Sequence, residues 1–192
     1  MMPRNKKRGF TLLEMIVTLS VFMIMTTIMI SSNRNTTKTV VLNTLANQVI
    51  SVIRQSESYA LTKPALSIGN YPPYGVYFST GSPSSFILFK DTNKDHLYTE
   101  GESLQNLTFQ PGFTIAKLCV NMKKNNKTPT TCTSVTNIDV SFTRPYPEPT
   151  ITTTTSTVGE IPFTDVEIIL SSGAGNIQKT IVVWVTGQLA IE

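Results

Sequence analysis

The sequence Lys6-Lys7-Arg8-Gly9-Phe10-Thr11-Leu12-Leu13-Glu14, with the apolar residues that follow it to Ile30, decides how this chain is built. A basic leader ends at Gly9, and a run of 21 residues from Phe10 to Ile30 comes next, with Glu14 as its only charged residue. At about 1.5 Å per residue a helix of this length spans about 31 Å, which matches the hydrocarbon core of a bilayer. Basic flanks stay in the cytoplasm. We therefore expect residues 10–30 to cross the membrane and the residues after Ile30 to lie outside the cytoplasm.

Two ordinary explanations fit this stretch less well. A secretory signal has an apolar core of about 7–15 residues and a small-residue cleavage site, whereas this run is longer, contains an acid and ends at Ser31-Ser32-Asn33. A signal anchor accounts for the length and the charge but leaves Gly9 and Glu14 unexplained. The stretch resembles the leader of type IV prepilins and type II secretion pseudopilins. In that family a membrane peptidase cuts after the glycine and methylates the new N-terminal residue.

The resemblance implies roles for three residues. Cleavage would fall between Gly9 and Phe10, and Phe10 would carry the N-methyl group. Glu14 would pair with the N-terminal amine of a neighbouring subunit in a filament. A buried acid in lipid costs on the order of 2.5–3.5 kcal/mol, so it usually has a partner, although Glu14 could instead reach the lipid headgroups. The implied partners are other pilin or pseudopilin subunits, the prepilin peptidase, an inner-membrane assembly platform and membrane lipid.

The overall charge gives no reason to expect a nucleic-acid-binding protein. The chain has sixteen basic and twelve acidic residues, but four of the basic ones lie in the leader. After cleavage, the mature chain would contain twelve basic and twelve acidic residues. The mature chain is therefore close to neutral, and its charge points to no particular partner.

A second helical pattern follows the apolar run. Residues 31–39 are polar and rich in poor helix formers, which predicts the exit from the bilayer and a soft joint. Helical periodicity then returns up to Leu61, and Pro64 predicts that the helix ends near Thr62. The apolar face of this segment, which needs a partner surface, comprises Val41, Leu42, Leu45, Ala46, Val49, Ile50, Val52 and Ile53.

The remaining sequence is typical of a β-rich domain. Short β-branched and aromatic runs alternate with Gly, Pro, Asn and Ser, and residues 144–162 are expected to form a long loop. We therefore expect an α+β, pilin-like fold: a leader (1–9), a long helix (10–62, with 10–30 transmembrane) packed on an antiparallel sheet, and a head (63–192). The predicted strands are 74–78, 85–89, 104–109, 114–120, 137–143, 165–171 and 179–186.

The order of the strands and the closing run Val-Val-Trp-Val-Thr-Gly-Gln-Leu resemble the GspH/FimT-like minor pseudopilins. This resemblance implies a structural subunit of a type IV pilus or of a type II secretion pseudopilus, anchored in the inner membrane. The alternative is a competence-type minor pilin that binds DNA for uptake. The sequence contains no nucleophile, phosphate-loop or zinc motif, so we do not expect an enzyme.

The loop from Asp91 to Glu102 is a candidate calcium site. Its oxygen-bearing residues fall at the spacing of an EF-hand loop, although His96 stands where a glycine is usual and strands replace the flanking helices. A polar hairpin loop held by Asx turns explains the same residues without a metal. The predicted ligands are Asp91, Asn93, Asp95, the carbonyl of Leu97, and Glu102.

Cys119 and Cys132 are the only cysteines. In a domain outside the cytoplasm such a pair is more often a disulfide than a metal site, so we expect a bridge. Lys117, Lys123, Lys124 and Lys127 lie in or beside the loop that this bridge closes. They are expected to be solvated, although a small anion or DNA contact is the alternative.

Overall fold

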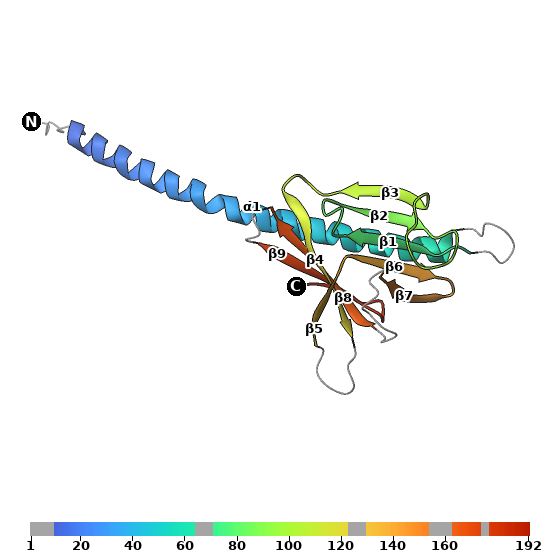
Figure 1. Ribbon diagram of the computed structural model, residues 1–192. Helices are drawn as coiled ribbons and strands as arrows, with labels where there is room; N and C mark the ends of the chain where they lie inside the picture. The colour runs from blue at the N-terminus through green and yellow to red at the C-terminus, as the bar shows by residue number, and fades with distance from the viewer. Residues whose placement is uncertain (1–9, 64–70, 123–129, 154–162, 174–176) are drawn as a thin grey trace, which may run out of the picture. The chain divides into compact units, whose positions relative to one another are not determined.

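The computed structural model describes residues 10–63, 71–122, 130–153, 163–173 and 177–192. In these residues one helix, α1 (Leu12–Thr62), is followed by ten strands in two sheets, and every neighbouring pair of strands is antiparallel (Figure 1). The α+β, pilin-like fold class is therefore confirmed. By its internal contacts the chain forms two units, Met1–Thr39 and Val40–Glu192.

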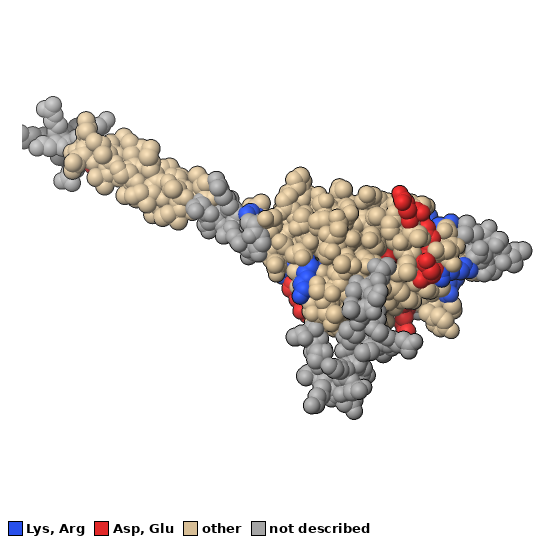
Figure 2. Space-filling view, in the orientation of Figure 1, with Lys and Arg blue, Asp and Glu red and all other residues tan. Residues whose placement is uncertain are grey.

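The first unit contains the beginning of α1. Helical hydrogen bonding starts just after Phe10 and continues through residues 31–39, so the polar stretch is not a break in the helix. The segment Leu12–Ile30 is long and apolar enough to span a membrane, and none of it is buried within the chain. Figure 2 shows this part of the molecule as almost wholly uncharged. Its apolar side chains therefore need lipid or other protein around them.

The second unit uses the rest of α1 as one wall of its core. The residues spaced for a single helix face are buried, while Asn43, Asn47 and Ser51 on the opposite face are exposed. Val41 and Ile50 are half-buried at the edges of that face. Burial of this face against the sheets, more than the intrinsic helix propensity of its residues, stabilises this part of the helix. The buried helical residues are Leu42, Leu45, Ala46, Val49, Val52, Ile53 and Ala60.

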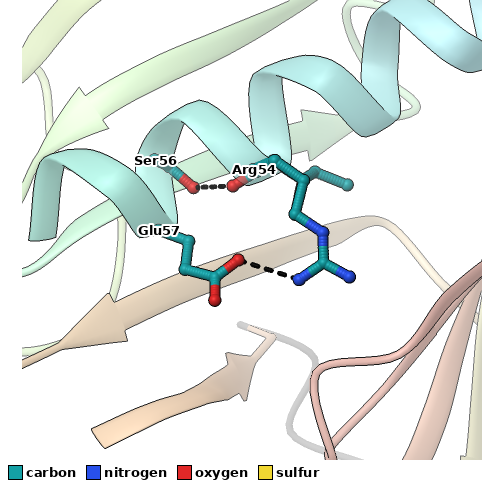
Figure 3. Close-up of polar contacts among 4 residues, drawn as sticks. Arg54, Ser56 and Glu57 are labelled. Carbon is teal, nitrogen blue, oxygen red and sulfur yellow. Dashed lines mark hydrogen bonds and ion pairs between the residues drawn. The ribbon is translucent and has the colours of Figure 1, made fainter. Parts of the chain in front are cut away.

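Polar groups on the second half of α1 are satisfied locally. Ser56 is completely buried, and its hydroxyl donates to the carbonyl oxygen of Ile53 at 2.7 Å (Figure 3). Arg54 and Glu57, one turn apart on the helix, form an ion pair at 2.8 Å. The Ser56 hydroxyl thus enters the core without an unpaired donor.

The first sheet lies along the second half of α1 and carries much of the aromatic core (Figure 1). Phe78 and Phe86 stack at 5.6 Å between ring centroids, and Phe86 meets Phe109 at 5.3 Å. On the other face of the sheet the ring of Phe89 covers Gly75, with which it pairs across the strands. The strand order is β3 (Ser103–Thr108), β2 (Ser85–Lys90), β1 (Tyr74–Ser79), β6 (Asn137–Thr143) and β7 (Tyr146–Thr152).

The second sheet completes the core of this unit. Its central strands bring Val166, Ile168, Ile181 and Val183 into the same buried cluster as the helix. The strand order is β10 (Leu189–Ile191), β9 (Gln178–Trp184), β8 (Phe163–Ser172), β4 (Phe113–Met122) and β5 (Thr130–Val135). The seven strands expected from the sequence are all present, with ends that differ by a few residues.

The expectation of a loop over residues 144–162 is wrong for its first part. Residues Tyr146–Thr152 form β7, which pairs with β6 through contacts such as Ile151 with Val140. The prolines in this segment suggested a loop, but β7 is an edge strand, where a residue without an N–H can be accommodated. The predicted loop residues 154–162 lie outside the described residues. The edge strands β5 and β10 were also missed, because their sequences are short or rich in Ser and Thr.

The C-terminal end of α1 is held by Arg144, from the turn between β6 and β7. Its guanidinium donates to the carbonyl oxygens of Ala60 and Lys63, both at 3.2 Å, and to that of Leu61. It also lies 4.6 Å from the centroid of the Tyr71 ring. The last carbonyls of a helix have no partner within the helix, and a cation there also meets the negative end of the helix dipole. Arg144 therefore takes the place of a C-cap.

Candidate functional site

The N-terminal end of α1 is capped within the sequence of the leader motif. The backbone N–H of Glu14 donates to the hydroxyl oxygen of Thr11 at 3.3 Å, which is the geometry of an N-cap residue and the third residue of the helix. Phe10 precedes this cap and is exposed, as is the Glu14 side chain. Thr11 thus starts the helix directly after the predicted new N-terminus. Gly9 and the rest of the leader lie outside the described residues.

The hydroxyl groups in the apolar segment are folded back onto the helix. Ser20 donates to the carbonyl of Ile16 at 2.7 Å, and Thr27 donates to that of Met23 at 2.8 Å. Thr18 and Thr26 do the same with residues three or four positions earlier. Such bonds satisfy the hydroxyl donors where no water is present. Glu14 is consequently the one strongly polar side chain that the segment leaves for an outside partner.

Comparison with known families identifies this stretch. Residues 4–30 match the prokaryotic N-terminal methylation motif. A motif at these residues marks a type IV pilin-like protein. No curated protein and no solved structure gives a significant match to it. The motif supports processing of this pilin-like protein by a prepilin peptidase and its assembly with other pilin subunits. It indicates a structural subunit, and the apolar segment fits an inner-membrane anchor.

The loop between β2 and β3 satisfies its carboxylates with its own N–H groups. Asp91 is completely buried and accepts from the N–H groups of Lys94, at 2.5 Å, and His96, at 2.9 Å. Each oxygen of Glu102 accepts two bonds, one pair from Thr92 and the other from Thr99, at distances of 2.7–3.0 Å. Lys94 and His96 have positive φ angles, of 64° and 62°. The backbone therefore bends around the buried carboxylates.

Asn93 and Asp95 occupy the outer part of this loop. Their side chains are exposed and bonded to each other at 2.9 Å, and Asp95 also accepts from the N–H of Leu97 at 2.8 Å. The side chains of Asn93 and Asp95 therefore bond within the loop, apart from the bonds that Asp91 and Glu102 accept. These are the Asx turns of the metal-free interpretation.

The same loop covers the outer face of the first sheet. The ring of Tyr98 lies 4.9 Å from that of Tyr77 and 5.7 Å from that of Phe89. The N–H of Tyr98 donates to Asp139 on β6 at 2.9 Å, and a ring nitrogen of His96 lies 3.0 Å from the hydroxyl of Ser141. Polar residues at alternate positions of β6, Asn137, Asp139 and Ser141, indicate from the sequence that one face of this strand is polar. The sequence did not show that a loop buries that face.

Burial and hydrogen bonding move the pKa values in this region in opposite directions. Burial raises the pKa of Asp139 from 3.8 to about 7, although the N–H of Tyr98 lowers it in part. Burial also raises the pKa of Asp91. For Glu102 burial acts upward as well, but the bonds from Thr99 and Thr92 outweigh it and bring the pKa down from 4.5 to about 2. Of Asp139 and Glu102, Asp139 therefore titrates closer to neutral pH.

We expect Asp139 to make the protein less stable as the pH rises. Between pH 3.8, the ordinary value, and about 7, the folded state binds the proton more tightly than the unfolded state, so stability falls across this window. Asp139→Asn keeps the acceptor for Tyr98 and removes the charge. Its melting temperature should exceed that of the wild type at pH 8 by roughly 5 °C and match it more closely at pH 4.

The difference in melting temperature between wild type and Asp139→Asn reports on Asp139 alone, because the other titrating groups are the same in both proteins. Glu102 acts in a separate window, because its stabilisation is lost only as the pH falls from about 4.5 towards 2. Ser141→Ala, two residues along β6, serves as a control that keeps the acid. Identical pH profiles for Asp139→Asn and the wild type would refute the assignment.

Calcium binding by Asp91, Asn93, Asp95, Leu97 and Glu102 stays a prediction. The ion would have to share carboxylate oxygens that already accept N–H groups. If it binds the folded state alone, a hundredfold excess over Kd adds about 2.7 kcal/mol of stability.

The full chain in detergent should then melt at a higher temperature in millimolar calcium than in chelator. Asp95→Ala should remove the increment, and Glu100→Ala, outside the ligand set, should keep it; equal melting in calcium and chelator would leave the metal-free loop.

The predicted disulfide between Cys119 and Cys132 is present and joins β4 to β5. Glu167 on β8 lies close to both sulfur atoms, but thiols joined in a bridge are not available as metal ligands. Lys117 is exposed on β4, whereas Lys123, Lys124 and Lys127 lie outside the described residues. The bridge closes a short loop, and such a link stabilises by about 3 kcal/mol.

Proposed function

We propose that this pilin-like protein is a minor pilin or pseudopilin, a structural subunit of a thin filament that serves secretion or pilus assembly. The observation that carries the proposal is the exposed apolar segment Leu12–Ile30 with a single acid, Glu14, near its capped start. A surface of this kind can be covered either by lipid before assembly or by other subunits afterwards. The leader lies on the cytoplasmic side, and the head lies outside the cytoplasm.

In this proposal Glu14 favours the assembled filament over the free subunit in the membrane. The acid is poorly solvated in lipid, and the methylated amine of Phe10 on a neighbouring subunit is a cation of matching depth. Pairing the two groups removes the cost of the isolated charge, so docking into the filament is favoured over remaining in the bilayer. An inner-membrane assembly platform would supply the force that lifts each subunit.

The experiment uses the source organism with the full chain at its native level. We expect the protein in sheared filaments to begin at Phe10 and to carry one added methyl group there, measured by intact mass. Deletion of the gene should reduce secretion or the number of pili. A mature N-terminus near Asn33, an uncut leader, or absence from the filament fraction would contradict the proposal.

The same deletion strain separates the two functional classes. The structural function predicts normal DNA uptake or a loss that accompanies the loss of filaments. A competence-type subunit predicts normal filaments with defective uptake, and purified protein that binds DNA with a steep dependence on salt. The near neutrality of the mature chain favours the structural function.

A further inference from the structure

A cavity of about 310 Å³ lies between the C-terminal end of α1 and the first sheet. Tyr59 and Lys63, one helical turn apart, come from the helix and the residue after it, and Tyr74 comes from β1. The strands β2 and β3 supply the remaining walls. The volume is at the lower end of the range for small-ligand sites.

Two lysines from different elements reach this cavity. The ammonium of Lys63 lies 4.5 Å from the centroid of the Tyr59 ring, and the backbone of Lys63 is held by the bond from Arg144 to its carbonyl oxygen. Lys90 continues the alternation of Phe86 and Leu88 along β2, whose side chains are buried in the core. Lys90 is therefore half-buried on the face of the sheet that otherwise packs against apolar groups.

Neither lysine has a protein counter-ion within the described residues. The ion pair of Arg54 with Glu57 is the only one in that part of the chain. The carboxylate of Glu102, near the end of β2 in the sheet, already accepts hydrogen bonds from Thr92 and Thr99 through both of its oxygens. Two lysines that line one cavity without a carboxylate beside them give it a positive charge, which favours an anion from outside the chain.

The wall between the two lysines is apolar and aromatic. Leu88 is buried, and the rings of Tyr59 and Tyr74 meet edge to face at 5.8 Å. The pairing of β2 with β3 shifts register beside Leu88, and this irregularity lets the successive residues Leu104 and Gln105 both line the cavity. Leu104 is 49% exposed, which leaves apolar surface at the rim.

We propose that this cavity binds a carboxylate attached to an apolar body. The two ammonium groups bind the carboxylate, the aromatic rings and leucines contact the apolar part, and the amide of Gln105 offers a further hydrogen bond. Burial raises the pKa of the Tyr74 phenol, which keeps its hydroxyl as a neutral donor. Such a group occurs both in small organic acids and in acidic side chains of peptides. This inference does not depend on the proposed function.

The test measures binding to the full chain in a neutral maltoside detergent by titration calorimetry. Benzoate represents a free organic acid, N-acetyl-phenylalanyl-glutamate amide represents a peptide, and benzamide is the uncharged match for benzoate. We expect benzoate to bind at least ten times more tightly than benzamide. Lys90→Met and Lys63→Met, which keep an apolar stem, should each weaken benzoate binding about tenfold. Lys117→Met, on β4 of the second sheet, should leave it unchanged.

The remaining outcomes are also decisive. Tighter binding of the peptide than of benzoate would identify a protein partner, and the reverse order would identify a small acid. Equal binding of benzoate and benzamide, or unchanged affinity in Lys90→Met, would overturn the proposal. Inorganic phosphate that binds as well as benzoate would overturn the requirement for an apolar body. The melting temperature of each variant shows that a lost signal does not come from unfolding.

Discussion

Replacement of Glu14 by valine is expected to leave the protein in the membrane and to remove it from filaments. The variant loses the only charge of the apolar segment, so insertion into lipid becomes easier. It also loses the acid that would meet the N-terminal amine of the next subunit. The amount of protein in the sheared-filament fraction, relative to the membrane fraction, should fall by at least tenfold.

Two controls separate assembly from folding and processing in this experiment. The cap from Thr11 uses the backbone N–H of Glu14, so valine at this position leaves the start of the helix intact. Ser20→Ala removes a hydroxyl that bonds only to the helix and should assemble normally. Intact mass should show the same cleavage and methylation in all three proteins. Normal incorporation of Glu14→Val would exclude the pairing with the amine.

Replacement of Gly75 by alanine is expected to cause the largest loss of stability in the head. A Cβ atom at this position would lie 2.7 Å from an atom of the Phe89 ring and 2.8 Å from the carbonyl oxygen of Val140. Neither contact can be relieved cheaply, because the ring packs against Tyr98 and the oxygen belongs to the neighbouring strand β6. We expect a loss of about 2–3 kcal/mol, measured by chemical unfolding of the full chain in detergent.

Gly81→Ala provides the matched control. Its Cβ would meet nothing closer than the hydroxyl of Ser79 at 3.4 Å, so its effect on stability should be within about 0.5 kcal/mol. A second variant, Phe89→Leu combined with Gly75→Ala, should recover part of the loss by removing the ring from the contact. Equal stabilities of Gly75→Ala and Gly81→Ala would show that the strand absorbs the methyl group.

The sequence predicted those features that depend on one segment alone. The exposed apolar helix follows from the length and composition of residues 10–30. The buried face from Leu42 to Ile53 follows from helical spacing. Most strands were predicted because their residues alternate and turns separate them. The bridge between Cys119 and Cys132 followed from there being only two cysteines, in a domain expected to lie outside the cytoplasm.

The features that sequence reasoning missed depend on contacts between distant segments. Asp139 gives no sign in the sequence that the loop carrying Tyr98, 41 positions earlier, will cover it. Arg144 looks like an ordinary turn residue until the sheet brings it to Ala60, 84 positions away. The strand β7 was missed because proline was read as a loop signal, whereas its effect depends on whether the strand lies at an edge. Thr11 could have been recognised, since Thr11 and Glu14 have the spacing of a capping box.

The Arg144 contacts also have a mechanical consequence. A force directed along α1 towards its N-terminus loads the packed face of the helix in shear, so its buried side chains slide past the sheets together. The bonds from Arg144 to Ala60, Leu61 and Lys63 lie at the opposite end of the helix and stretch at the same moment. Withdrawal of the helix therefore has no weak end from which to start. We therefore expect the strands to stay folded under such a force until the buried helix face and the Arg144 bonds separate together.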